Sequence, residues 1–428
     1  MKRFAWILSA SAICLAQTNY APSLLSRGAL PEASPSRVET VLQPSVGVLS
    51  GYDNGPLTTS LARAGGPFEE IEGGLEARRL GRRTNLRLDY QFGLRHYTSN
   101  SSLDRSNHGF NLDARFFLSP RWSLNLRDVG TSSSFGSSFQ ASPSALSSGF
   151  FLDSGTEVFH SRTIANTALA DLVFSPSART SASVAGDGFI VQRQFRSLAD
   201  AIGWRARADV AHRYARHKTV SLSYSFTHFD HSRMFGGADY AVYAFGHSVR
   251  LSKTAELDLL GGAGYLRSAG VRAVQLDPEI AALLGTSRGA EIFRVSTWTP
   301  HLVAAWVQGI GRAELRVEFA RVVSDGGGLT GVARQNQGSI MVQAARSRSW
   351  RASAHLAARR LRSLDTLLYD NTMAVAGATL ARRLTNHTEA VWRYQFAFYN
   401  FQRGLLHDFR RHEAAAGIIC YFRDLRKQ

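Results

Sequence analysis

The sequence predicts an all-β protein: a transmembrane, antiparallel, up-and-down β-barrel of about eighteen strands, with sixteen as the alternative count. Three observations predict it. Apolar and polar residues alternate with period two along most of the chain. Short polar turns and longer polar segments follow each other in alternation. The chain also begins like an exported protein.

The composition excludes several other classes of protein. Of 428 residues, 44% are hydrophobic and 19% are charged, and only 2 are Cys, which excludes a disordered chain and a disulfide-held scaffold. No apolar stretch reaches the length of about 18 residues that suits a membrane-crossing helix. Lys and Arg outnumber Asp and Glu by 50 to 33, and the net charge is +17. The basic residues are spread over many segments, which argues against a nucleic-acid partner.

The N-terminus predicts export. A short basic start precedes the apolar residues 4–16, which end in Cys14-Leu15-Ala16, and this tripeptide resembles a small-x-small cleavage site. We expect a signal peptide over 1–16, with an uncleaved signal anchor as the alternative. The proline-containing segment 17–43 is then a flexible periplasmic tail, and 44–428 is the barrel.

The strands are predicted by strict alternation. In 85–94, apolar side chains occupy every even position from Leu86 to Leu94, and polar or small residues occupy the odd positions. This is the period of a strand, since successive side chains of a helix do not alternate between two faces. The same alternation recurs at 110–116, 204–210, 220–226, 314–319, 350–356 and 392–398.

The connections between these strands are short and long in turn. Eight tight turns are expected at 81–83, 119–121, 175–177, 216–218, 252–254, 309–311, 347–349 and 385–387. Nine longer loops are expected at 54–67, 98–105, 134–156, 190–199, 230–238, 268–290, 323–331, 362–369 and 402–410. Together these turns and loops join eighteen strands.

Short turns on one side and long loops on the other are typical of a barrel in the bacterial outer membrane. A sheet in lipid has to close on itself, because an open edge would leave backbone groups without hydrogen bonds. Both termini then lie on the periplasmic side, and Trp122 and Trp350 beside the turns fit an aromatic girdle. A soluble propeller, a sandwich or a periplasmic solenoid is the alternative, but no repeated motif is visible.

The polar face of the strands predicts the wall of the lumen. Arginine and carboxylate residues share this face, so they form either ion-paired ladders that brace the wall or a positively charged channel that attracts anions. The residues expected to line the pore and contact a solute are Arg87, Arg95, Arg115, Arg127, Arg205, Arg207, Arg213, Arg250, Arg316, Arg351, Arg393, Asp89, Asp113, Glu314 and Glu318.

Catalysis is not expected. None of the sequence motifs of serine hydrolases, zinc proteases or P-loop proteins occurs in the chain. The best catalytic cluster, His228 with Asp230 and His231, lies where a strand enters a loop, and solvated loop histidines explain it more simply. His108, His228 and His247 lack a diagnostic metal-site spacing. We therefore expect no enzyme activity, no cofactor and no metal.

Several segments resemble a group of outer-membrane barrels that is linked to exopolysaccharide export and exosortase systems. The resemblance is carried by Leu42–Asn54, Arg87–Tyr97, Asn107-His108 and Leu118–Leu124, with the turns at 119–121 and 252–254. It implies a role in moving a polysaccharide and supplies no catalytic residues. The chain departs from the group at its end, where residues 423–428 follow the aromatic pair Tyr421-Phe422 that the assembly machinery would recognise.

The sequence thus predicts an outer-membrane channel, and the resemblance implies a conduit for secretion of an exopolysaccharide. A general or anion-preferring diffusion porin and a non-transporting structural barrel are the alternatives. The expected partners are outer-membrane lipid and lipopolysaccharide, the barrel-assembly machinery, and a polysaccharide with its periplasmic export proteins. The barrel is expected to be a monomer.

Overall fold

A computed structural model describes the chain from residue 39 to residue 422. Segments 56–64, 134–161, 195–197, 232–235, 327–331, 345–348, 365–369 and 404–407, with the single residues 100 and 276, are outside the described part. The predicted signal peptide and most of the predicted periplasmic tail therefore lie outside the described residues, as does the predicted loop at 134–156.

The fold is a single 18-stranded sheet closed into a barrel, which confirms the predicted fold class and strand number. The strands are β1 (Glu39–Asp53), β2 (Gly66–Leu80), β3 (Thr84–Tyr97), β4 (Arg105–Phe117), β5 (Trp122–Ser133), β6 (Thr163–Phe174), β7 (Thr180–Arg193), β8 (Ala201–Ala215), β9 (Lys218–His231), β10 (Gly236–Arg250), β11 (Ala255–Gln275), β12 (Arg288–Ile310), β13 (Ala313–Ser324), β14 (Ala333–Ala344), β15 (Trp350–Ser363), β16 (Asp370–Arg383), β17 (Thr388–Arg403) and β18 (Phe409–Tyr421). A short 3-10 helix, η1 (Ser101–Leu103), precedes β4 and one α-helix, α5 (Pro278–Leu284), follows β11.

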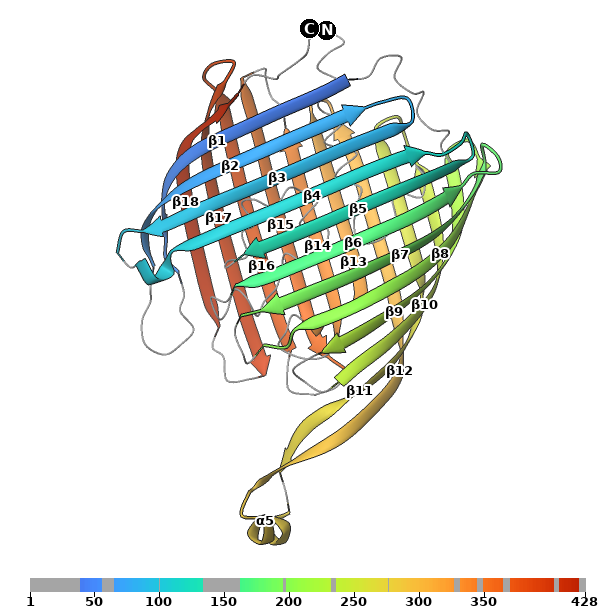
Figure 1. The fold of residues 1–428 in the computed structure, drawn as a ribbon, viewed down its shortest axis with the longest axis vertical. Coiled ribbons are helices and arrows are strands. Elements are labelled where there is room, and N and C mark those ends of the chain that lie inside the picture. The colour runs from blue at the N-terminus through green and yellow to red at the C-terminus, as the bar shows by residue number, and fades with distance from the viewer. Residues whose placement is uncertain are drawn as a thin grey trace.

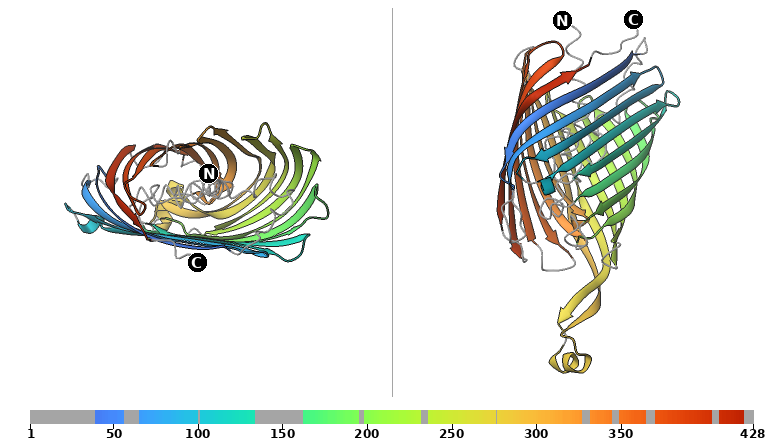
Figure 2. Two further views of the ribbon diagram at one scale, coloured as in Figure 1. Left: turned by 90° about the horizontal axis from the view of Figure 1, so that it is seen from above. Right: turned by 60° about the vertical axis from the view of Figure 1, so that its left-hand side comes forward.

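Each strand pairs antiparallel with its neighbours in sequence, and the first strand closes the ring by pairing with the last. The closing register runs from Ser45 opposite Tyr421 to Asp53 opposite Glu413. The start of β1 and the end of β18 lie at the same end of the barrel, the end of the short turns (Figure 1). The barrel is flattened in cross-section, as the view along its axis shows (Figure 2).

The tight turns are stabilised by hydroxyl groups at their first position. Ser119 Oγ accepts hydrogen bonds from the backbone N–H groups of Arg121 and Trp122 at 3.2 and 3.1 Å. Ser177 and Thr385 accept equivalent bonds in their own turns. In the two-residue turn between β12 and β13, Gly311 has a φ of 61°, a conformation that glycine adopts without steric cost. Seven of the eight predicted turns lie between the expected strands, and the turn predicted at 347–349 lies largely outside the described residues.

The predicted loop at 268–290 is wrong in its extent. β11 continues to Gln275 and β12 starts at Arg288, so the two strands pair far beyond their neighbours. β10 pairs with β11 only as far as Ala269, and β13 pairs with β12 only as far as Leu302. The result is a hairpin that ends in α5 and projects from the loop end of the barrel (Figure 1).

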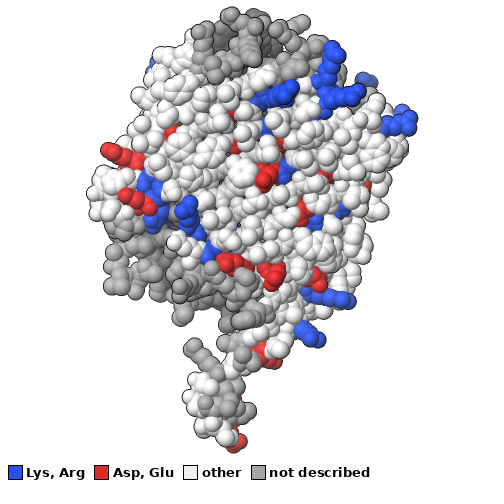
Figure 3. Space-filling model, in the orientation of Figure 1, with Lys and Arg blue, Asp and Glu red and all other residues white. Residues whose placement is uncertain are grey.

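The ladder registers divide the side chains into an inward and an outward set. Large apolar side chains occupy the outward set, for example Val48, Val184, Leu222 and Leu356, which are 49–67% exposed. Trp122 stacks on Phe174 with ring centroids 4.5 Å apart at the turn end, and the predicted girdle residue Trp350 stacks on Trp392 there. Lys and Arg side chains project at the turn-side edge of the face formed by β1–β8 (Figure 3).

The apolar side chains of the outward set, which form a belt around the barrel, indicate the cellular location of the protein. Apolar side chains that would be costly to expose to water are accommodated in the hydrocarbon of a bilayer. The closed ring leaves no unpaired strand edge within the barrel wall, which is the condition for a sheet to cross lipid. The chain is a β-barrel of the bacterial outer membrane. No helix among the described residues is long and apolar enough to cross a membrane.

Candidate functional site: the inner wall of the barrel

The candidate site is the inner wall, and every residue predicted to line it lies on it. The registers of β3, β4, β5, β8, β10, β13, β15 and β17 place all fifteen predicted residues at inward positions. Arg213 and Arg250 lie near the turn-side ends of β8 and β10, and Glu314 lies near the turn-side end of β13. Arg115 packs its guanidinium over the ring of Phe117, 4.9 Å from the ring centroid.

Most of these arginines are ion-paired with carboxylates on the same wall. The shortest N–O distances are 3.1 Å for Arg87–Asp89, 3.6 Å for Arg127–Asp113, 2.8 Å for Arg205–Asp187, 2.8 Å for Arg207–Asp209, 2.5 Å for Arg316–Glu318 and 2.6 Å for Arg393–Glu72. Arg351 is paired with Glu389. The wall therefore carries alternating charges of both signs rather than a continuous positive surface.

The densest ion network lies where the first and last strands meet. Arg95 on β3 contacts Glu70 at 2.7 Å and Glu413 at 2.6 Å, and Arg411 on β18 contacts Asp53 and Glu413, each at 2.7 Å. All five side chains are at most 9% exposed. We call these five residues the seam network.

Two aromatic residues complete the seam network. The hydroxyl of Tyr97 donates to Asp53 Oδ2 at 2.9 Å. The guanidinium of Arg95 lies over the ring of Phe68, 4.0 Å from its centroid. Because Asp53 is on β1 and Arg411 on β18, the network ties the ring closed at its loop end.

Towards the turn end, the same walls leave a hollow of about 310 Å³. Its inward lining comes from β1, β2, β3, β17 and β18 and includes Gly47, Gly74, Gln91 and Tyr421, with the Glu72–Arg393 pair. Small residues at 45, 47 and 74 keep this part of the wall thin on its inner side. Arg393 spans the hollow's wall by donating to both carboxylate oxygens of Glu72, at 2.6 and 2.9 Å.

Buried apolar side chains line another sector of the inner wall. Phe189, Phe229, Tyr240, Val242 and Leu266 are buried at inward positions of β7, β9, β10 and β11, and they form one cluster with residues at the loop end of β13 and β14. We call this group the apolar cluster.

Gly203 makes room for the apolar cluster. The Phe189 ring lies so close that a Cβ at residue 203 would be 2.3 Å from it. The ring thereby reaches across β8 to Phe229, with ring centroids 5.6 Å apart. At the loop end, Arg193, the last residue of β7, pairs with Asp325 after β13 at 2.8 Å, joining strands that are six places apart in the ring.

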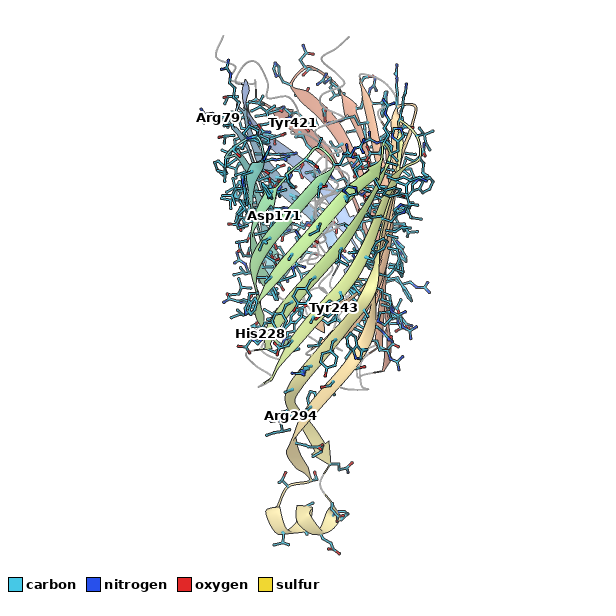
Figure 4. All side chains as sticks on the ribbon, turned by 90° about the vertical axis from the view of Figure 1, so that its right-hand side faces the viewer. Arg79, Asp171, His228, Tyr243, Arg294 and Tyr421 are labelled. Atoms are coloured by element: carbon cyan, nitrogen blue, oxygen red, sulfur yellow. The ribbon has the colours of Figure 1, made fainter. Side chains whose placement is uncertain are left out.

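The catalytic candidate does not assemble. His228 and Asp230 point outward and His231 points inward, because successive residues of β9 alternate between the two faces. His228 lies near the loop end of the barrel (Figure 4) and pairs with Asp239 through Nδ1 at 2.7 Å. His108 and His247 contact the hydroxyls of Tyr90 and Tyr214 instead. No cluster of metal-ligating side chains occurs in the part of the chain that the structure describes.

The sequence-based residue set missed the partners of several arginines. Asp53, Arg411 and Glu413 are absent from it, as are Asp187 and Glu389. The period-two pattern contained the necessary signal for β18, since Arg411 and Glu413 alternate with the outward Ala414 and Ala416. Asp53 is the last residue of β1, so no alternation follows it that would indicate whether its side chain faces inward or outward.

Comparisons with known proteins were made at the level of sequence and of structure. No protein-family model and no curated protein sequence matches the chain. The ferric-catecholate import receptor Fiu from E. coli K12 is 8% identical, with a TM-score of 0.43, over 88% of this chain and 81% of that one.

Two further solved structures are similar over nearly their whole length. OccK9 (OpdG) from Pseudomonas aeruginosa is 11% identical, with a TM-score of 0.43, over 90% of this chain and 99% of that one. OccAB4 from Acinetobacter baumannii is 8% identical, with a TM-score of 0.41, over 92% of this chain and 100% of that one. The function of this barrel has to be inferred from its own wall.

Proposed function

We propose that the protein is an outer-membrane channel for the diffusion of small polar solutes. The observation that carries the proposal is the hollow beside Glu72 and Arg393, a polar space inside a closed ring of 18 strands. A barrel of this size encloses more space than side chains alone fill. The apolar cluster blocks the sector around β7–β11, so the path runs along the walls of β1–β3 and β17–β18.

The charge pattern of the wall supports weak ion selectivity. A strongly anion-selective pore needs positive charges whose field is not cancelled nearby. Here the inward arginines lie 2.5–3.6 Å from carboxylates in seven pairs on several strands. The paired charges bind water and small polar solutes without retaining either sign of ion. Of the sequence-based alternatives, a general diffusion porin fits this wall better than an anion-preferring one.

The polysaccharide conduit implied by the family resemblance has no support in the structure. A secreted polymer would need a wide path along the whole barrel, whereas the apolar cluster occupies one sector of this lumen. The resemblance rests on turn and strand patterns that any barrel shares. The diffusion channel is therefore the interpretation we advance.

The proposal is tested by conductance of the folded protein in a planar bilayer. We expect a small, steady conductance with nearly equal permeability to K⁺ and Cl⁻, and liposome swelling in small sugars but not in long oligosaccharides. A folded protein without conductance would show a closed, structural barrel. Block by a long acidic glycan from one side would restore the polysaccharide conduit.

Two variants of the hollow give opposite signatures. Arg393→Ser leaves Glu72 without its partner, and we expect the reversal potential to shift towards cation preference. Glu72→Ser leaves Arg393, and we expect the shift to reverse sign. The matched control is Arg79→Ser at the outward turn-side rim (Figure 4), which should leave the reversal potential unchanged. Equal shifts from all three variants would contradict a path along this wall.

A further inference from the structure

A group of arginines on the outside of the barrel has no role in the inner wall. Arg321 on β13, Arg334 on β14, and Arg360 and Arg362 on β15 all occupy outward positions. Arg334 lies opposite Arg362 in the ladder, and the charges of Arg321, Arg360 and Arg362 all act on it. We call these four residues the outer arginine cluster.

The outer arginine cluster lies at the boundary of the apolar belt. β13 and β15 end, and β14 begins, within three residues of it on the loop side. On the other side, beyond the outward Asn336, Gly338 and Ala358, the next large apolar outward residues are Phe319, Ile340 and Leu356, which are 40%, 44% and 49% exposed. In a bilayer these apolar side chains lie in hydrocarbon, so the arginines are level with the headgroups of the outer leaflet.

The outer arginine cluster has N–H donors that lack hydrogen-bond acceptors. Asp370 lies opposite Arg362 in the ladder and accepts two hydrogen bonds from Arg360, at 2.8 and 2.5 Å. Among the described residues, the Nε groups of Arg321 and Arg334 are buried without a hydrogen-bond acceptor. A buried donor without an acceptor costs free energy comparable to that of a lost hydrogen bond. Like charges held together add to that cost, so an anion at this place would relieve both.

We propose that the outer arginine cluster binds the phosphate groups of an anionic glycolipid in the outer leaflet, of the lipopolysaccharide class. Guanidinium groups bind phosphate oxygens through paired N–H donors. The apolar side chains below the cluster would contact the acyl chains of the same lipid. This combination of a phosphate site above a lipid-facing apolar surface favours a lipid headgroup over a soluble phosphate.

The test uses the full, folded barrel in phosphatidylcholine nanodiscs that contain either bisphosphorylated or dephosphorylated lipid A. Bound lipid is counted, and its dissociation constant measured, by native mass spectrometry. We expect the unchanged protein to retain the bisphosphorylated form. In the double variant Arg334→Gln/Arg362→Gln we expect binding to be at least about tenfold weaker, since each basic residue near an anionic surface contributes substantially to attraction.

A matched control removes the same charge elsewhere on the loop side. Arg267 is exposed on the outward face of β11 opposite Asp239, and Arg294 is exposed on the projecting hairpin (Figure 4). The double variant Arg267→Gln/Arg294→Gln should bind as the unchanged protein does. The heat-dependent shift in electrophoretic mobility reports whether each variant is folded.

Three results would overturn the proposal. Equal retention of dephosphorylated lipid A would show that apolar contact alone holds the lipid. Equal loss of binding in both double variants would show attraction by net charge rather than by a site. Displacement of the lipid by inorganic pyrophosphate at the same concentration would assign the cluster to soluble phosphates.

Discussion

At the scale of single residues, the seam network makes Arg95 the most sensitive charged position in the barrel. Its side chain is 7% exposed and is shared by Glu70 and Glu413. We expect Arg95→Met to lower the free energy of unfolding by about 3–5 kcal/mol, because it leaves the buried Glu70 without its cation and Glu413 with Arg411 alone. Urea unfolding of the protein in lipid vesicles measures this loss.

A second arginine provides the control for Arg95. Arg87 pairs with Asp89, but both side chains are 23% exposed, so water screens the pair. We expect Arg87→Met to cost less than about 1 kcal/mol. Adding Glu70→Gln to Arg95→Met should recover part of the stability, because the carboxylate left without its cation is then neutral. Equal losses from Arg95→Met and Arg87→Met would show that burial in the seam network has no special effect.

At the scale of elements, the sequence predicted what local chemistry determines. The turns were predictable because Ser, Pro, Gly and Lys mark them, and in the structure Ser119, Ser177 and Thr385 do accept the turn N–H groups. The inward set was predictable because alternation assigns every residue of a strand to one face. The extent of β11 and β12 was not, since the small polar residues 268–270 have the composition of a loop.

The pairing of the inward charges was also beyond the sequence. Arg411 and Asp53 form an ion pair across a separation of 358 residues, because the last strand closes onto the first. The stagger between the closing strands decides which side chains contact each other, and period-two alternation carries no information about this stagger. The sequence therefore predicted which arginines face the lumen but not which carboxylate each would contact.

The projecting hairpin should be removable without loss of the barrel. Replacing residues 272–291 by Asn-Gly joins Val271 to Ile292, which already face each other in the ladder, through a two-residue turn. We expect refolding yield, unfolding midpoint and conductance to be unchanged, because this part of the hairpin pairs with neither β10 nor β13.

The control lies on the same strand but inside the rim. Leu266 is fully buried in the apolar cluster, and Leu266→Ala should lower the free energy of unfolding by about 2–5 kcal/mol. A barrel that fails to fold without the hairpin would show that residues 272–291 take part in closing the ring.

At the scale of the whole molecule, the barrel is flattened in cross-section (Figure 2). Its wall differs between two sectors, because one is lined by the apolar cluster and the other by the polar hollow beside Glu72 and Arg393. A path that runs along one side of the barrel predicts that the access of a reagent to an inward residue depends on the strand that carries the residue, and not only on its depth in the membrane. Cysteine labelling can separate the sectors, because Cys420 is the sole described cysteine and can be replaced by Ser.

In the Cys420→Ser background, we expect Gln91→Cys to react with a charged, membrane-impermeant methanethiosulfonate and the conductance to fall as the group enters the path. Gln91 lines the hollow. Ala244→Cys lies in the apolar cluster, where the native residue is 4% exposed, so the same reagent should leave its conductance unchanged. Reaction at residue 244 but not at residue 91 would show that the solute path runs beside the apolar cluster and not along the hollow. Equal reaction at both would mean that solvent fills the whole cross-section, and the narrow path inferred from the wall would be wrong.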